Sequence, residues 1–300
     1  MRLKPVKRWV RFHLLRAVLG MLSLLPRRWG LRVFGWLGEG AYWVLPKPRQ
    51  QILQNLRRIH PEWEEAACRS FAREVMRNMG RNAVDFVRLR RYGPADVEAI
   101  AHLEGAERMR ACLERGRGMI GLGGHLGCWE IIPLRLRAEG FEVGVVYRRS
   151  SDPRIDRYII TRRRRAGITT HDRDTDGRGI LRRLRENAIM GILIDVSTRV
   201  DSTQVPFMGH PAWTPLGVAR LAMRTGAAVL PLVSYMREDG AHVVEAGEEV
   251  PILYAPPGGT REEASRLEVE NTRRCNEVLG AIIARHELQW AWMHPRWRER

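Results

Sequence analysis

The stretch Met119-Ile-Gly-Leu-Gly-Gly-His-Leu-Gly-Cys-Trp-Glu130 decides how the chain folds around its candidate site. Its apolar start predicts a buried strand over Met119–Leu122. The glycines that follow allow a tight turn or a close approach of the backbone to a ligand. A helix that contains Glu130 and runs to about Ala138 is expected next. His125 is therefore predicted to lie in a glycine turn between a strand and a helix.

The spacing of His125 and Glu130 suggests acid–base chemistry. Five residues of an ideal helix span a rotation of about 140°, so the two side chains converge only if His125 precedes the helix. A histidine can take a proton from an alcohol, and a carboxylate on its other nitrogen fixes its tautomer. We therefore expect His125 to act as general base and Glu130 to orient it. The plain alternative is a polar turn histidine beside a glutamate that favours the helix dipole.

The same stretch resembles the His-x4-Asp/Glu motif of glycerolipid acyltransferases, and most of all the bacterial lipid A biosynthesis (lauroyl/myristoyl) branch. In two places the chain departs from that pattern: Cys128 stands where asparagine is common, and no glutamine follows Asp195. These departures bear on which acceptor lipid the resemblance implies, and less on the fold that it implies. Further matches to the branch, which extend the resemblance over most of residues 10–300, are Val146-Tyr147-Arg148 with Asp152-Pro153 and Asp156, the arginine run before Gly167, residues 205–227, and residues 289–297.

The resemblance implies an enzyme that moves a fatty acyl chain from a thioester to a hydroxyl of a glycolipid. The donor would be acyl carrier protein or acyl-CoA, and the acceptor a lipid A precursor of lipopolysaccharide biosynthesis. The resemblance further implies that the enzyme acts on the cytoplasmic face of a bacterial inner membrane. Neither a cofactor nor a metal is expected. The resemblance also points to Arg148 and Arg163 as groups that bind anionic parts of the substrate.

Asp195 and Cys128 need separate interpretations. Asp195 ends a predicted buried strand over Ile189–Ile194, so a role in the substrate site is expected, with a loop cap as the alternative. Cys128 is close enough to His125 in sequence to suggest a covalent nucleophile. It would, however, lie in the first helical turn and point elsewhere, so we prefer a small buried side chain.

The charge of the chain predicts an acidic partner. Its 51 lysines and arginines exceed its 34 aspartates and glutamates, which gives a net charge of +17. Acyl carrier protein, phosphorylated lipids and an anionic membrane all fit this charge. Nucleic acid does not fit, because the tryptophans cluster with apolar segments and are not interleaved with the basic run. The four cysteines are scattered without a Cys-x-x-Cys pair, which argues against a zinc site or a disulfide framework.

Residues 1–46 differ from the rest of the chain. They combine basic residues and tryptophans with two apolar segments, neither of which reaches the ~18 uninterrupted apolar residues of a membrane span. We expect a helical anchor that lies on an anionic membrane surface. An ordinary amphipathic helix packed on the domain is the alternative.

Residues 47–300 are predicted to form one α/β acyltransferase domain. Helices are expected over Gln50–Ile59 and from Glu64 to about Arg90, and strands alternate with helices from Ile100 onwards. This alternation predicts a mainly parallel central sheet flanked by helices on both faces. Two other functions remain open. One is acyl transfer to a phosphoglycolipid, an aminolipid or a lysophospholipid, and the other is a non-catalytic protein that binds anionic membranes.

Overall fold

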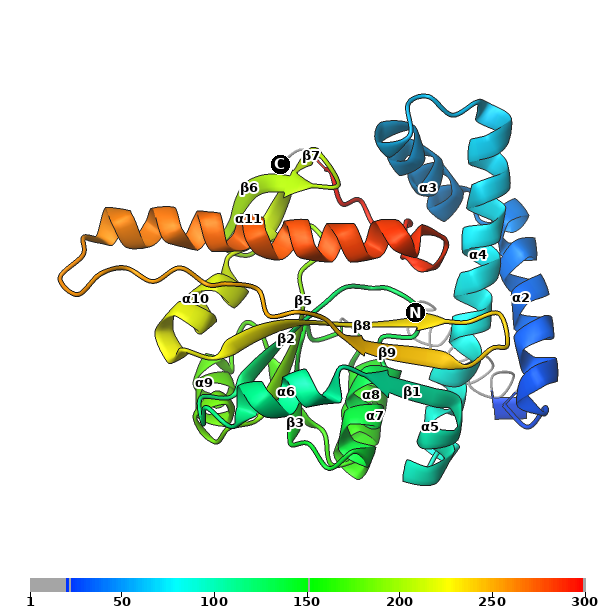
Figure 1. Ribbon diagram of the computed structural model, residues 1–300. Coiled ribbons are helices and arrows are strands. Elements are labelled where there is room, and N and C mark those ends of the chain that lie inside the picture. Colours follow the sequence, from blue (N-terminus) through cyan, green and yellow to red (C-terminus); the bar gives the residue numbers. More distant parts are fainter. Residues whose placement is uncertain (1–19, 22, 151, 299–300) are drawn as a thin grey trace, which may run out of the picture.

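The computed structural model describes residues 20–298, except residues 22 and 151 (Figure 1). Most of the described residues form an α/β body around a central sheet, which follows the helices α2 (Arg27–Val44), α3 (Pro46–Ile59) and α4 (Glu65–Arg88). Residues 1–19 of the expected anchor lie outside the described residues. The remaining helices are α5 (Pro94–Ile100), α6 (Ala106–Leu113), α7 (Ile131–Ala138), α8 (Pro153–Arg165), α9 (Gly177–Arg185), α10 (Gly217–Thr225) and α11 (Arg261–Arg285), with the short turns η1 (Leu89–Arg91) and η2 (Glu287–Gln289).

The central sheet has seven strands in the order β1-β9-β8-β2-β5-β3-β4. β8, β2, β5, β3 and β4 are mutually parallel, whereas β9 runs antiparallel to β8 and pairs in parallel with the edge strand β1. The predicted α/β class with a mainly parallel sheet is therefore confirmed. The strands are β1 (Ala101–Glu104), β2 (Met119–Gly123), β3 (Val143–Tyr147), β4 (Thr169–Asp172), β5 (Ile189–Leu193), β8 (Ala228–Met236) and β9 (His242–Ala246).

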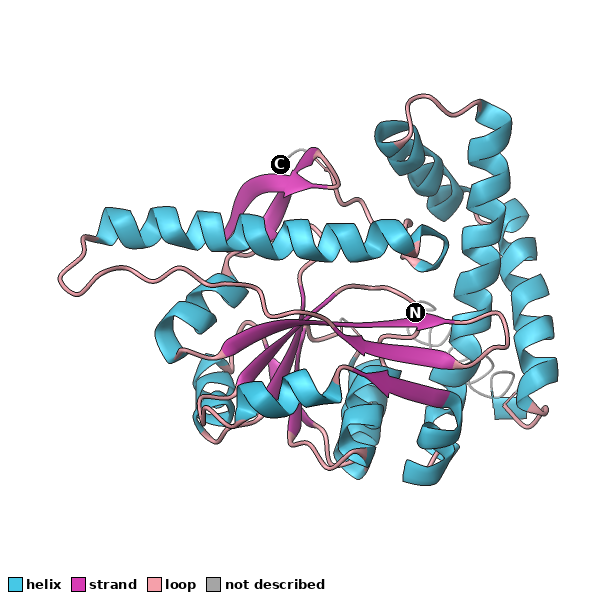
Figure 2. Cartoon of the chain, viewed as in Figure 1, coloured by secondary structure: helices cyan, strands magenta, loops and turns pink. Residues whose placement is uncertain are grey.

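Each face of the sheet has its own hydrophobic core because strand side chains alternate between the two faces. Ile120 and Leu122 of β2 pack into the core that includes residues of α9, α10 and α11, whereas Met119 packs into the core with residues of α5, α6 and α7. Figure 2 shows α11 on one side of the sheet and α6 and α7 on the other. The buried run predicted for β2 thus serves both cores.

The sequence analysis does not predict four elements of the structure, namely β4, β6 (Ser202–Phe207), β7 (His210–Pro215) and α5. The edge strand β4 reads Thr-Thr-His-Asp and lacks an apolar run, so its pattern resembles a loop. β6 and β7 form an antiparallel hairpin, and α10 begins after it at Gly217. α5 was also missed, and it occupies Ile100, the first residue of a predicted strand.

α2 and α4 pack with their backbones in direct contact. A side chain at Gly38 of α2 would overlap the carbonyl oxygen of Met76, and one at Gly80 of α4 would overlap that of Phe34. Only glycine permits this approach. On its other side α2 exposes Trp29, which is followed at seven-residue intervals by Trp36 and Trp43, both exposed. Within residues 20–298, no helix is both long and apolar enough to cross a membrane.

Candidate active site

The candidate site lies where two neighbouring parallel strands end. β2 and β5 are paired through Gly123 and Leu193, and each strand is followed two residues later by a functional side chain, His125 and Asp195. Nδ1 of His125 lies 2.8 Å from Oδ1 of Asp195. Ligands bind at the carboxyl ends of strands in open parallel sheets, so this pair occupies the expected edge.

The buried carboxylate of Asp195 accepts three hydrogen bonds. Besides Nδ1 of His125, the backbone N–H of His125 (2.6 Å) and the indole Nε1–H of Trp290 (2.8 Å) both donate to Oδ2. Burial opposes the charged form, but His125 and the other donors outweigh it and lower the pKa of Asp195 to about 2. An ionised Asp195 accepts hydrogen bonds only, so the proton of a neutral His125 belongs on Nδ1.

His125 is therefore arranged as a base. Burial lowers the pKa of its imidazole. The nearby Asp195 carboxylate raises that pKa by more than burial lowers it, so the pKa lies above its usual value. With Nδ1 bound to Asp195, Nε2 carries the free lone pair and has no hydrogen-bond partner within the described part of the chain. The rings of Trp129 and His294 lie 4.8 Å and 5.1 Å from the His125 ring, centroid to centroid.

The turn that carries His125 is held by a distant segment of the chain. Ala291 donates its backbone N–H to the carbonyl of His125, and Gly127 donates to the carbonyl of Gln289, both at 3.0 Å. Leu126 and Trp290 form an antiparallel bridge between them. Gly127 has a φ of +56°, and a Cβ there would overlap the carbonyl oxygen of Ser234, so glycine is required.

Glu130 does not make the contact expected of it. It immediately precedes α7, and its carboxylate pairs with Arg163 of α8 through an Nε–Oε2 distance of 3.1 Å and a second contact between Nη2 and Oε1. Within the described residues, the carboxylate that binds His125 is Asp195. The reason is geometric: β5 lies next to β2, which brings Asp195 beside the turn, while Glu130 points towards α8.

A cavity of about 210 Å³ opens beside His125. Its walls are mostly apolar, and one side is the face of α4. A second cavity, of about 260 Å³, shares Phe86 and Glu130 with the first and is also lined by Arg163. The residues that line the first cavity are Met79, Asn82, Ala83, Phe86, His125, Gly127, Cys128, Trp129, Glu130, Gln289 and Ala291.

The other candidate residues are placed differently. Arg148 is exposed just after β3, and in the described residues no hydrogen bond or ion pair joins it to His125, Asp195 or Glu130. Arg163, in contrast, is largely buried against Glu130. Cys128 lines the cavity but is buried, which raises the pKa of its thiol and disfavours the thiolate that a nucleophile needs.

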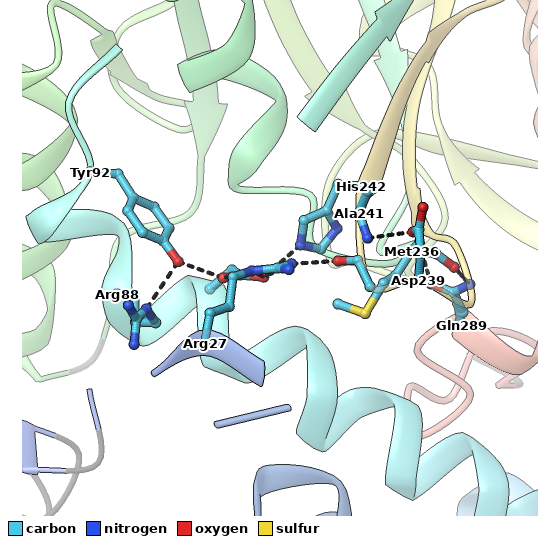
Figure 3. A network of polar contacts seen from close by, with 10 residues as sticks. Arg27, Arg88, Tyr92, Met236, Asp239, Ala241, His242 and Gln289 are labelled. Atoms are coloured by element: carbon cyan, nitrogen blue, oxygen red, sulfur yellow. Dashed lines mark hydrogen bonds and ion pairs between the residues drawn. The ribbon is translucent and has the colours of Figure 1, made fainter. Parts of the chain in front are cut away.

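A second buried carboxylate, Asp85 of α4, binds another histidine. It accepts hydrogen bonds from Nε2 of His242 on β9 (2.8 Å), from the Tyr92 hydroxyl (2.7 Å) and from Arg27 of α2 (2.7 Å to Nη2). Figure 3 shows Arg27, Tyr92 and His242 around this group, with Arg88 donating to the tyrosine oxygen. The network joins α2 and α4 to β9 of the central sheet.

Comparison with known families places this geometry in a functional context. The model of the bacterial lipid A biosynthesis acyltransferase family matches residues 2–299. The chain belongs to this family. It is therefore an acyltransferase of the lipid A biosynthesis type, and the strand-turn-helix unit with His125 lies within the matched residues. A search of curated proteins finds no match.

No group of three or more histidine, cysteine, aspartate or glutamate side chains within residues 20–298 is arranged to hold a metal ion in this acyltransferase. Trp290 is the main site residue that the sequence did not predict. Its motif was recognised only as a stretch similar to the family, and no local pattern indicates that its indole reaches Asp195 from 95 positions away.

Proposed function

We propose that this acyltransferase moves a fatty acyl chain from acyl carrier protein, or from another acyl thioester such as acyl-CoA, to a hydroxyl of a lipid A precursor. The observation that carries the proposal is the His125–Asp195 pair, whose histidine faces a mostly apolar cavity. An apolar wall suits an alkyl chain, and a base at its mouth suits activation of an alcohol.

In the proposed reaction, Nε2 of His125 takes the proton of the acceptor hydroxyl as its oxygen attacks the thioester carbonyl. The new C–O bond produces a tetrahedral intermediate, which then breaks its C–S bond. The proton on Nε2 passes to the leaving thiolate, so the products are an ester and a free thiol. Asp195 stabilises the imidazolium that exists between these two steps through its 2.8 Å contact with Nδ1.

We propose that the Glu130–Arg163 pair binds negative charge and does not transfer the proton. Their paired contacts hold the guanidinium beside the cavities, where a fixed positive charge suits the negative charge of the intermediate or a phosphate of the acceptor. Glu130 then serves catalysis by holding Arg163. Arg148, which is exposed directly after β3, is proposed to bind an anionic group of the substrate at the protein surface.

The basic surface of α8 and α9 supports an acidic donor. Exposed arginines follow one another on these helices, and the net charge of the chain is +17. Such a surface attracts acyl carrier protein, which is acidic, and accelerates its encounter with the enzyme. The exposed arginines are Arg157, Arg164, Arg165, Arg178, Arg182 and Arg185.

We further propose that residues 1–46 bind the cytoplasmic face of the inner membrane and that residues 47–300 form the catalytic domain. The exposed tryptophans of α2 are accompanied by exposed Arg28 and Arg32, a combination that suits the headgroup region of an anionic leaflet. Replacing Trp29, Trp36 and Trp43 together by alanine should reduce sedimentation with anionic vesicles. Undiminished sedimentation of the triple variant would exclude this face of α2 as the contact.

The enzymatic proposal is tested with purified protein in detergent. Acyl-carrier-protein and acyl-CoA donors are offered with a lipid A precursor, and the His125→Ala variant is the control. We expect an acylated glycolipid with the natural chain and none with the variant. Transfer only to a phosphoglycolipid, an aminolipid or a lysophospholipid would identify a different acceptor. Absence of any transfer or thioester hydrolysis would contradict the enzymatic function. Mass spectrometry of lipids from a deletion strain identifies the acceptor independently.

A further inference from the structure

Trp290 is the one residue outside the catalytic turn that donates to Asp195 within the described part of the chain. Its indole is 1% exposed, and its Nε1–H lies 2.8 Å from Oδ2. The other two donors to this carboxylate both belong to His125. Without Trp290, the orientation of Asp195 would depend entirely on the group that Asp195 has to orient.

The indole is itself held firmly. Its ring lies 4.9 Å from that of Trp292, 5.7 Å from that of Phe207 and 5.9 Å from that of Trp297, centroid to centroid. Its backbone forms the bridge to Leu126 in the catalytic turn. A donor fixed on two sides by packing and pairing can fix a carboxylate in turn.

The distribution of donors over the two carboxylate oxygens matters. Oδ2 receives Trp290 and the backbone N–H of His125, which leaves Oδ1 to face Nδ1 of the imidazole. An indole N–H can only donate, so this contact stabilises the ionised carboxylate and cannot reverse. It also draws part of the negative charge away from the histidine.

We propose that Trp290 is a positioning residue for the proton-transfer pair: its indole N–H fixes the Asp195 carboxylate and sets how much negative charge faces His125. This inference rests on the proposed function of His125 as the base. Trp290 acts through Asp195 and need not touch the substrate. The aromatic segment at residues 290–297 would thereby have a role in the reaction as well as in the core.

The chain offers a matched control. Trp292 belongs to the same segment, is equally buried, and donates its Nε1–H to the backbone carbonyl of Glu287 at 2.7 Å. Trp290→Phe and Trp292→Phe each remove one indole N–H from a buried ring, but only the first removes a donor to the site. Comparing melting temperatures of the two variants measures the structural cost that they share.

The rate and its pH dependence separate positioning from packing. We expect Trp290→Phe to lower kcat by about tenfold or more, since a hydrogen bond to a charged group is lost. With one donor fewer, more of the charge of Asp195 faces His125 and favours the imidazolium. The pKa of His125 then rises, so the acid limb of the rate profile moves to higher pH. Trp292→Phe should keep the natural profile.

A double-mutant cycle with Asp195→Asn provides the second test. If Trp290 acts through the carboxylate, Trp290→Phe should change the rate of the Asp195→Asn enzyme very little. Equal losses in both backgrounds, or an unshifted pH profile, would overturn the proposal. If Trp290→Phe fails to fold, Trp290→His restores a ring N–H in a smaller side chain. It should then retain a rate and profile closer to the natural enzyme than Trp290→Leu does, and equal behaviour of those two would also overturn the proposal.

A failure of the proposed function can be distinguished from a failure of the role proposed for Trp290. Full activity of His125→Ala would refute the base itself, whatever Trp290 does. An inactive His125→Ala together with a natural rate and profile for Trp290→Phe would refute only the role of Trp290.

Discussion

Among the described residues, two buried aspartates, Asp195 and Asp85, each bind a histidine, and the differences between the two pairs show what makes one histidine a candidate base. Asp195 binds His125, and Asp85 binds His242, both at 2.8 Å. The His125 side chain is 21% exposed and lines a cavity, whereas that of His242 is fully buried. Only in the first pair can the second ring nitrogen reach a substrate, as the proposed role of His125 requires.

The electrostatic surroundings of the two pairs differ as well. Arg27 forms an ion pair with Asp85, so the carboxylate is neutralised without its histidine. Asp195 has no arginine or lysine bound to it within the described residues, and its charge is left to act on His125. A carboxylate that is already neutralised ties helices to the sheet, and one that is not can stabilise an imidazolium.

The strongest test of the difference between the two pairs is to replace each histidine. We expect His125→Ala to lower the transfer rate by at least about a hundredfold, since the general base is lost. His242→Gln should lower stability but leave the rate per folded molecule unchanged. Transfer assays combined with thermal melts measure both. Comparable rate losses in the two variants would mean that accessibility does not distinguish the pairs.

Removing each carboxylate should divide the effects in the same way, with a loss of stability at Asp85 and a loss of rate at Asp195. Asp85→Ala leaves Arg27 and His242 buried without their partner, which we expect to cost about 3–5 kcal/mol of stability. Asp195→Asn keeps the shape of the site and should mainly lower kcat. Urea unfolding and initial rates give the two quantities. A stable Asp85→Ala protein would show that the network does not hold α2 and α4 to the sheet.

Variants of Glu130 test whether this glutamate affects the reaction through Arg163. We expect Glu130→Ala and Glu130→Gln each to lower the rate by about tenfold or more, because a charge-assisted contact is lost. In the Arg163→Ala background, the further loss should be small. Rates of the four enzymes form the cycle, and independent losses would return Glu130 to a direct role at His125.

The two members of the Asp195–His125 pair should respond differently to pH. The pKa of Asp195 is lowered from 3.8 to about 2, so its contribution to stability is complete above the unfolded value and is lost as pH falls towards 2. The pKa of His125 is raised above 6.5, so its contribution is complete below 6.5 and is lost as pH rises through the folded value. Activity should increase over that same rise because the base becomes neutral. Stability and kcat measured over one pH series should therefore diverge, and parallel curves would contradict the assignment.

The smallest expected effect concerns the exposed arginines. Arg148→Ala should cost more activity than Arg182→Ala, although each removes one charge, because Arg148 follows a strand that ends at the edge of the sheet where the site lies. The loss at Arg182 should mainly change the dependence on salt. Rates over a salt series measure this. Equal defects that salt abolishes would place Arg148 in the general basic surface.

The sequence predicted the strand, turn and helix around His125 because each has a local cause: an apolar run, glycines and a helical pattern. It did not identify the carboxylate partner of His125. That choice depends on β5 lying between β2 and β3, and strand order is set by long-range packing that no local pattern reveals. Asp195 was still recognised as a site candidate because it follows a buried strand. Trp290 was missed because its contact joins residues that are far apart in the chain.

The contact between Gly38 and Gly80 has a consequence for the proposed membrane-bound state. One face of α4 lines the cavity at His125, another touches α2, and α2 presents the tryptophans proposed to enter the headgroups. Two backbones in contact leave no side chains that could be lengthened or shortened to change their separation. In that proposed state, the distance between the tryptophans and His125 is set by the packing of α2 on α4, and a single methyl group at either glycine would force the two helices apart.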